Sequence, residues 1–129
     1  MITFNMTQHA ASNDQLKAGV VELNEIYKTT LLEALNFEGV PTSSDVSKAV
    51  QLMAGLMDEQ EAYETEEVQF MVGGAPYLMA ALTQWAPIYR MVFACSNRVS
   101  EEQHMPDGSV RKVNVFKHIG FTPMYCPNI

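Results

Sequence analysis

The stretch Val68-Gln69-Phe70-Met71-Val72-Gly73-Gly74-Ala75-Pro76-Tyr77-Leu78-Met79-Ala80-Ala81-Leu82 decides the fold, because it reads as a strand, a tight turn and a helix in succession. Residues 68–72 are mostly apolar and β-prone, as expected of a strand covered on both faces in a parallel sheet. Gly73 and Gly74 favour a turn with a close backbone approach that a side chain would obstruct. Pro76 suits the first turn of a helix, which we expect to run from residue 76 to about residue 85.

This strand–turn–helix unit also predicts a ligand site. The turn points free backbone N–H groups and the positive end of a helix dipole at the crevice where open α/β sheets bind their ligands. An anionic ligand is therefore favoured, although a glycine pair between a strand and a helix can also do no more than turn the chain. The sequence here is neither G-x-G-x-x-G nor the lysine-bearing phosphate loop, so it does not specifically indicate a dinucleotide or a nucleoside triphosphate.

The residues before this unit predict two further strands and three helices. Strands are expected at residues 2–6 and 20–23, because both runs are short and apolar. A short helix should run from residue 13 to about residue 18, with a capping box formed by Ser12 and Gln15. A second helix is expected at 25–36 after Asn24 as N-cap, and a third is expected to be capped near Ser43 or Ser44.

The residues after the unit predict a strand and a hairpin. Pro87 ends the helix, and residues 89–96 form the next strand candidate. Residues 99–104 and 109–116 then flank the turn sequence Met105-Pro106-Asp107-Gly108, which is typical of a β-hairpin. The alternation of strands and helices predicts an α/β fold with a mainly parallel sheet flanked by helices. We expect a single domain over residues 1–129, with a C-terminal hairpin at about 99–118.

Composition limits the possible partners. The formal net charge of −7 disfavours long nucleic acid as a ligand. Residues 1–89 hold three Lys or Arg against twelve Asp or Glu, a net of −9, whereas residues 90–129 hold five against three, a net of +2. A small anion could find a local basic site there, although these cations can equally solvate the hairpin and protect its edge.

The sequence also predicts the location of the protein. It contains no run of about 18 apolar residues and no signal-peptide pattern at its start, so we expect a cytoplasmic protein that does not span a membrane. Cys95 and Cys126 are expected to be reduced thiols, and the three histidines have no metal-ligand spacing. We therefore expect neither a metal nor a cofactor.

Three polar clusters follow predicted strands and should meet at one edge of the sheet if the strands are parallel neighbours. The clusters are Asn5, Thr7, Gln8 and His9; Gly73 and Gly74; and Ser96, Asn97 and Arg98. His9 is a candidate general acid or base, and Arg98 a candidate phosphate clamp. Each has a structural alternative: His9 can be a surface histidine before a helix, and Arg98 can pair with a hairpin carboxylate. His118, on an alternating segment, can face a ligand or be a half-buried, hydrogen-bonded side chain.

Two segments resemble a known family. They are Asn5-Met6-Thr7-Gln8-His9 with Asp14-Gln15, and Ser96-Asn97-Arg98-Val99-Ser100-Glu101-Glu102 through Pro106-Asp107-Gly108-Ser109-Val110 to Val115-Phe116-Lys117-His118-Ile119-Gly120-Phe121. Together they resemble the small CRISPR-associated stand-alone ring nucleases of type III systems, which are similar to the Rossmann-like domains that sense cyclic oligoadenylates. The similarity covers about half of the chain.

The resemblance implies cleavage of cyclic tetra-adenylate to linear di-adenylate with a 2′,3′-cyclic phosphate, without a metal, by attack of a ribose 2′-hydroxyl on the adjacent phosphate. Such cleavage would switch off type III CRISPR antiviral signalling. The implied protein is a Rossmann-like homodimer, because a two-fold assembly suits a symmetric ring. It further implies that Gly73 and Gly74 hold phosphate, that Arg98 and Lys112 counter its charge, and that His9, Thr7 or Ser96 orient or protonate the reacting oxygens. Asn5, Gln8, Asn97 and His118 would complete the ligand contacts.

The sequence departs from this expectation in one respect and leaves two alternatives open. No lysine lies near the glycine turn, and the chain as a whole is acidic. One alternative is a non-catalytic sensor or sponge that binds a nucleotide messenger. The other is a small α/β interaction protein whose hairpin docks on another chain.

Overall fold

The computed structural model describes residues 1–126 and has a five-stranded mixed α/β fold. Its sheet has the strand order β2-β1-β3-β4-β5, in which the first four strands are parallel neighbours and β5 runs antiparallel to β4. The strands are β1 (Ile2–Asn5), β2 (Val20–Glu22), β3 (Val68–Met71), β4 (Met91–His104) and β5 (Val110–Pro123). The helices are α1 (Asn13–Lys17), α2 (Glu25–Leu35), α3 (Ser43–Tyr63) and α4 (Pro76–Leu82), followed by the short 3-10 helix η1 (Thr83–Trp85). The predicted mainly parallel α/β sheet with a C-terminal hairpin is confirmed.

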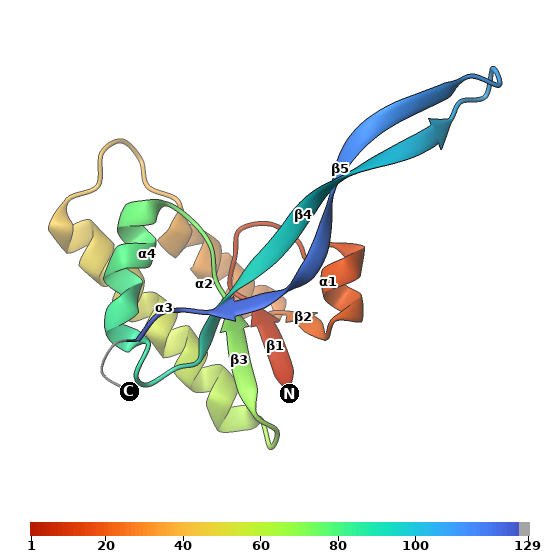
Figure 1. The fold of residues 1–129 in the computed structure, drawn as a ribbon. Helices are drawn as coiled ribbons and strands as arrows, with labels where there is room; N and C mark the ends of the chain where they lie inside the picture. Colours follow the sequence, from red (N-terminus) through yellow and green to blue (C-terminus); the bar gives the residue numbers. More distant parts are fainter. Residues whose placement is uncertain (127–129) are drawn as a thin grey trace.

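The strand order creates a switch point between β1 and β3. After β1 the chain passes through α1 to β2 on one side, and after β3 it passes through α4 to β4 on the other (Figure 1). Both connections therefore start at the carboxyl ends of the parallel strands and run in opposite directions, which opens a crevice between them. In open α/β sheets this is the place where ligands bind.

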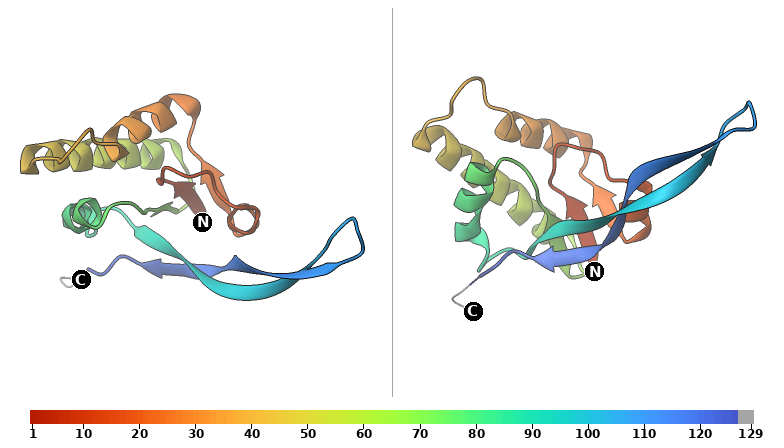
Figure 2. Two further views of the ribbon diagram at one scale, coloured as in Figure 1. Left: turned by 90° about the horizontal axis from the view of Figure 1, so that it is seen from above. Right: turned by 45° about the horizontal axis from the view of Figure 1, so that its top comes forward.

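Most of the core lies on one face of the sheet. Figure 2 shows α2, α3 and α4 on this face and α1 on the opposite one, while the β4–β5 hairpin continues the sheet at its edge. Phe4 and Phe70 of neighbouring strands stack with ring centroids 6.1 Å apart, and Tyr89 meets the Phe70 ring edge-on at 6.3 Å. Apolar residues of the three helices cover these rings, including Leu31, Met53, Met57, Leu78 and Leu82.

The opposite face has a smaller apolar cluster. Val20, Met71 and Val92 are buried there, and Ala11 and Phe121 pack against them. Two polar side chains on the same face, Thr3 and Gln69, are also buried and satisfy each other, because the Gln69 amide donates to the Thr3 hydroxyl at 2.9 Å. Burial of this face fits the expectation that a central parallel strand is covered on both sides.

The hairpin is longer than the sequence predicted. Residues 89–96 and 99–104 were expected to be separate strands, whereas β4 is continuous from Met91 to His104. It pairs with β5 along its whole length, and the irregularity at Cys95/Ser96 is a bulge that leaves Ile119 without an opposite residue. The predicted turn is confirmed, with Gly108 at φ 85° and its N–H bonded to the Met105 carbonyl.

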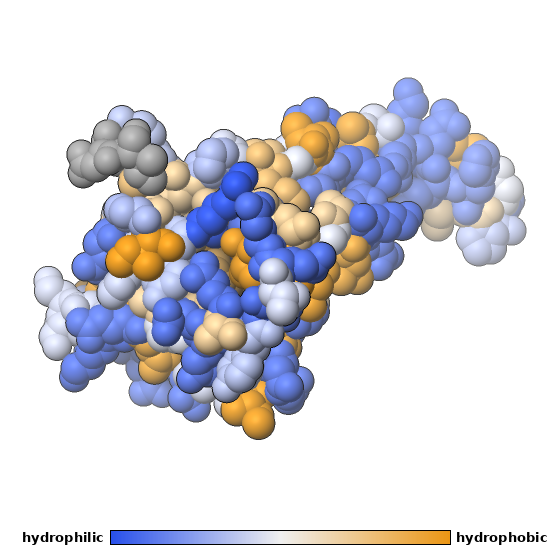
Figure 3. All heavy atoms as spheres, turned by 90° about the horizontal axis from the view of Figure 1, so that it is seen from below, coloured by the Kyte–Doolittle hydropathy of each residue, from blue (hydrophilic) through white to orange (hydrophobic). Residues whose placement is uncertain are grey.

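We call residues 96–118 the arm. β3 pairs with β4 only at Met91 and Val92, so the arm extends beyond the sheet as a two-stranded ribbon (Figures 1 and 2). In the space-filling view of Figure 3, it is mostly hydrophilic with scattered apolar groups.

The helix ends largely follow the sequence signals. The capping box of Ser12 and Gln15 and the Asn24 cap are both present. The third cap differs, because Thr42 rather than Ser43 or Ser44 caps α3, and Asp45 completes its capping box. Of the helices in residues 1–126, none is long and apolar enough to cross a membrane.

Candidate functional site

A pocket of about 520 Å³ lies at the switch point of the sheet. Its walls come from the connection after β1, the connection after β3 and the base of the hairpin. The lining residues are Thr7, Gln8, His9, Ala10, Ser12, Gln15, Met71, Val72, Gly73, Gly74, Phe93 and Ala94. A pocket of this size and position is suited to a small-molecule ligand. The predicted convergence of the first two polar clusters is confirmed, because five of their six residues line it.

Asn5 shapes the pocket without lining it. Its side chain is buried at the end of β1, where its Oδ1 accepts from the Thr7 N–H at 2.9 Å and from the Thr7 hydroxyl at 2.7 Å. Its amide group donates to the His9 carbonyl at 2.7 Å and to Glu22 at 3.0 Å. The expected role of Asn5 as a ligand contact is therefore corrected: these four bonds fix the connection that carries Thr7, Gln8 and His9.

Glu22 is a second support that the sequence reasoning missed. It lies directly opposite Asn5 in the β1–β2 pair. Its carboxylate accepts from the Ala11 N–H at 2.7 Å and pairs with Lys28 at 3.1 Å. Burial raises the pKa of Glu22, but the bonds from Asn5, Ala11 and Lys28 together outweigh it and hold the pKa below its usual value. A signal was present, since Glu22 ends its strand as Asn5 does.

This arrangement predicts an acid-sensitive connection. A carboxyl group with a lowered pKa in the folded state contributes stability above its unfolded pKa, and that contribution is lost as the pH falls through the folded pKa. We expect Glu22→Gln to lower the melting temperature at pH 7, and this difference from wild type to shrink below about pH 4.5. Thermal unfolding of both proteins from pH 7 to pH 3 measures it. Lys28→Met removes one partner of Glu22, so in that background the effect of Glu22→Gln on the melting temperature should depend less on pH. A difference in melting temperature between wild type and Glu22→Gln that stays constant with pH would contradict the assignment.

The connection after β3 supplies backbone groups. Gly73 and Gly74 line the pocket, and α4 begins at Pro76 with no side chain capping its amino end. A Cβ atom would lie 3.5 Å from the Thr7 methyl group at Gly73, and 3.5 Å from the Met79 methyl group at Gly74. Both are ordinary contacts. Crowding therefore does not require glycine in this turn, but backbone geometry does at Gly74, whose φ of 158° is rarely adopted by residues with a side chain.

His9 brings an imidazole to the pocket lining, a group that can act as a general acid or base. It is exposed, and its Nε2 lies 3.5 Å from the Gln8 amide nitrogen. The Asn5 amide donates to the His9 carbonyl, so the backbone that carries the His9 ring is held in place. Thr7 has less freedom, since its hydroxyl is engaged with Asn5 and lies 3.1 Å from the His9 carbonyl. Gln8 is exposed beside them.

The third predicted cluster does not join the pocket of its own chain. Ser96, Asn97 and Arg98 were expected to follow a strand, but they lie within β4 on the arm, and none of them lines the pocket. The physical reason is that β5 continues to pair with β4 past the bulge, so the strand does not end at this polar sequence. The Arg98 guanidinium lies over the Phe116 ring, 5.4 Å from its centroid.

Lys112 and His118 are also on the arm. Lys112 lies opposite Glu102 near the tip. His118 lies opposite Ser96 and packs against Phe121, with ring centroids 4.8 Å apart. Its Nδ1 is buried without a hydrogen-bond partner, so the hydrogen-bonded alternative for His118 is not met at that nitrogen.

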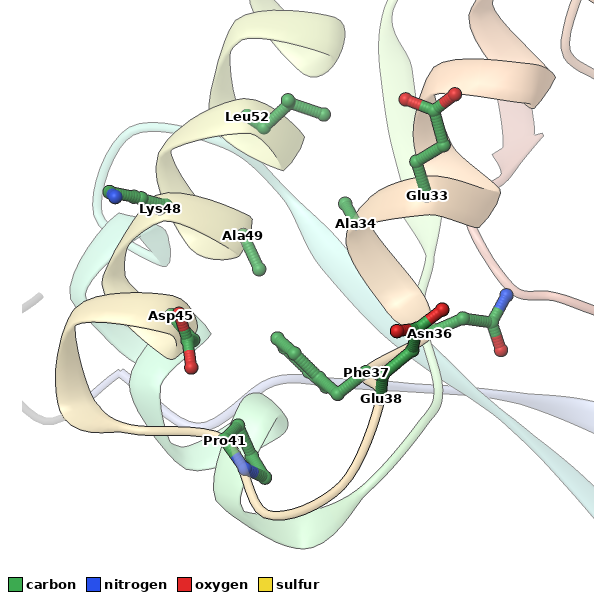
Figure 4. Close-up of a pocket in the computed structure, with 10 residues that line it drawn as sticks. All are labelled: Glu33, Ala34, Asn36, Phe37, Glu38, Pro41, Asp45, Lys48, Ala49 and Leu52. Carbon is green, nitrogen blue, oxygen red and sulfur yellow. The ribbon is translucent and has the colours of Figure 1, made fainter.

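A second pocket, of about 380 Å³, lies between α2 and α3. Figure 4 shows Phe37 pointing from the connecting segment toward α3. Three carboxylates line this pocket, from Glu33, Glu38 and Asp45, against one cation, Lys48. Its charge disfavours an anionic ligand, and its lining residues come from the two helices and their connection. The pocket at the switch point is therefore the better candidate for the predicted anion.

The fold and the pocket define an α/β protein with a ligand-sized pocket at the carboxyl ends of its parallel strands. The chain belongs to the uncharacterized protein MJ1673 family, whose model matches residues 1–122. The match includes every lining residue of the pocket and the whole arm. No curated protein and no solved structure matches the chain.

Proposed function

We propose that the protein is a cytoplasmic ring nuclease that cleaves cyclic tetra-adenylate and so switches off type III CRISPR antiviral signalling. The observation that carries the proposal is the pocket at the switch point, which gathers His9, Gln8 and the Gly73–Gly74 backbone around a space suited to a small ligand. The resemblance of the β1 connection and of the arm to small CRISPR-associated ring nucleases supplies the identity of the ligand.

The proposed reaction needs no nucleophile from the protein. A ribose 2′-oxygen attacks the adjacent phosphorus, the bond from phosphorus to the 5′-oxygen breaks, and the products end in a 2′,3′-cyclic phosphate and a 5′-hydroxyl. One proton leaves the 2′-hydroxyl and one is delivered to the departing 5′-oxygen. Two such cleavages of the ring give two linear di-adenylates.

The pocket residues have complementary roles in this reaction. His9 is the side chain of the lining suited to act as a general acid or base. Backbone N–H groups at Gly73 and Gly74 and the Gln8 amide would hold the phosphate and its developing charge. The Asn5 and Glu22 bonds contribute by keeping the β1 connection in one conformation before the ligand arrives.

Incubation of the purified protein with cyclic tetra-adenylate in EDTA, followed by chromatography of the products, tests the proposal. Linear di-adenylate with a cyclic phosphate is expected. His9→Ala should lower the rate constant by about 100-fold or more, as for loss of a general acid or base. The control is Gln51→Ala, which removes an exposed polar side chain of α3 that does not line the pocket and should leave the rate unchanged. Full activity of His9→Ala would remove His9 from the mechanism.

One observation favours a second candidate, a non-catalytic sensor or sponge. Among the described residues that line the pocket, none is Asp, Glu, Lys or Arg, so the pocket of one chain offers a phosphate polar contacts but no full positive charge. In that case the ring would remain intact and raise the melting temperature of the protein. A thermal-shift measurement beside the chromatography separates the two candidates.

A further inference from the structure

We propose that the arm of a second copy of this chain packs against the protein and completes the pocket with Arg98. The inference rests on the proposed function, in that the pocket receives a phosphate-bearing ligand. It makes the functional unit a two-fold homodimer in which each site uses the connections of one chain and the arm of the other.

The distribution of charge is the first reason. The arm holds four Lys or Arg and three Asp or Glu, a net of +1, while the rest of the chain has a net of −8. Half of the eight cations of the chain are therefore on the arm, and two of its three histidines are there too. The arm of one copy is electrostatically complementary to the acidic body of another. The lining of the pocket holds no Lys or Arg, so a cation from the arm of a second copy would supply the positive charge that binds a phosphate.

The exposed surface of the arm is the second reason. An isolated two-stranded ribbon is only marginally stable in water, and beyond the bulge the arm has no third strand in the described structure. It nevertheless exposes Phe116 by 68% and Val110 by 53%. Both lie on the same face as Arg98, because Arg98 pairs directly with Phe116 and every second residue shares a face. This face is therefore unpartnered and carries an aromatic ring together with a cation.

The reach of the arm is the third reason. Nine residues of β4, from Ser96 to His104, rise about 3.3 Å each, so the arm is roughly 30 Å long. That length is comparable to the diameter of a small domain, so one arm can extend across the body of a second copy. The arm leaves its own body beside the pocket, at Phe93 and Ala94, and then extends away from it (Figure 1). A two-fold axis near this point would place each arm beside the pocket of the other chain.

The oligomeric state tests the arm without any nucleotide. Sedimentation equilibrium is expected to give 28.8 kDa, twice the 14.4 kDa of the chain. Phe116→Ser should weaken the dimer by tenfold or more, on the order of a buried aromatic contact. The control Ile26→Ser removes a side chain that is 76% exposed on α2 and should leave the dimer unchanged. The proposal would be overturned if the wild type were a monomer at a protein concentration on the order of 10⁻⁴ M. It would also be overturned if Phe116→Ser dimerised as tightly as the wild type.

Complementation tests the shared site. His9→Ala and Arg98→Gln are each expected to be inactive as homodimers. A heterodimer of the two, co-expressed with different tags and purified through both, contains one intact site of two and should recover about half of the wild-type activity. A heterodimer as inactive as its parents would show that Arg98 does not act across the interface and would overturn the shared site. If the wild type itself cleaves nothing, the proposed function fails, and the sedimentation result still decides whether the arm binds a second copy.

Discussion

Replacing Phe70 by alanine is expected to lower the free energy of unfolding by about 4 kcal/mol, because it empties the centre of the core. Phe70 is fully buried on β3, where its ring stacks on Phe4 and meets the edge of Tyr89. Domains of this size are stable by only about 5–15 kcal/mol, so the variant should be close to its unfolding threshold at room temperature. Urea unfolding followed by circular dichroism measures the change.

The matched control for Phe70 is Tyr63→Ala. Tyr63 is also aromatic but is 77% exposed at the end of α3. Its replacement should change the free energy of unfolding by no more than about 0.5 kcal/mol. Similar losses in the two variants would contradict the assignment of Phe70 to the centre of the core.

Asn5→Leu is expected to have the largest combined effect on stability and activity. Leucine has a similar size but removes both the donor and the acceptor that bind the β1 connection. The Thr7 N–H, the His9 carbonyl and the Glu22 carboxylate then lose a partner. We expect a loss of about 3 kcal/mol in the free energy of unfolding. We also expect the rate of cyclic tetra-adenylate cleavage to fall about as far as in His9→Ala, on the order of 100-fold, since His9 would no longer be positioned.

Asn24→Ala provides the comparison for Asn5. Asn24 caps α2 through one bond to the Ile26 N–H, so its loss should cost about 1 kcal/mol. Cleavage should persist, because Asn24 does not line the pocket. Chromatographic activity at a temperature where both variants remain folded separates the positioning role of Asn5 from a general loss of stability. Wild-type activity in folded Asn5→Leu would show that the connection needs no such support.

Local signals in the sequence were sufficient for most of the elements. Alternating and helical patterns of apolar residues, the Ser12–Gln15 capping box and the Gly73–Pro76 turn each depend on residues within a few positions of one another. The first two polar clusters were also predicted correctly to meet, because the carboxyl ends of parallel strands lie at one sheet edge.

The end of β4 could not be predicted in this way. Ser96-Asn97-Arg98 is polar and reads as the end of a strand, yet the strand continues because β5 supplies a partner for each of these residues. Whether a polar segment stays extended depends on a strand that arrives about 20 residues later. Pairing over that distance leaves no local signal at Ser96.

The sequence by itself determined most of the strands and helices, and the crevice at which the first two polar clusters meet, because the physical causes are local. Only the tertiary structure decided what those polar residues do. Asn5 of β1 lies opposite Glu22 of the adjacent strand β2, and its hydrogen bonds hold the connection after β1. Arg98 lies over the Phe116 ring on the arm. A hydrogen bond or a ring contact is set by which side chains meet in space, and the partners of Asn5 and Arg98 lie 17 and 18 residues away along the chain.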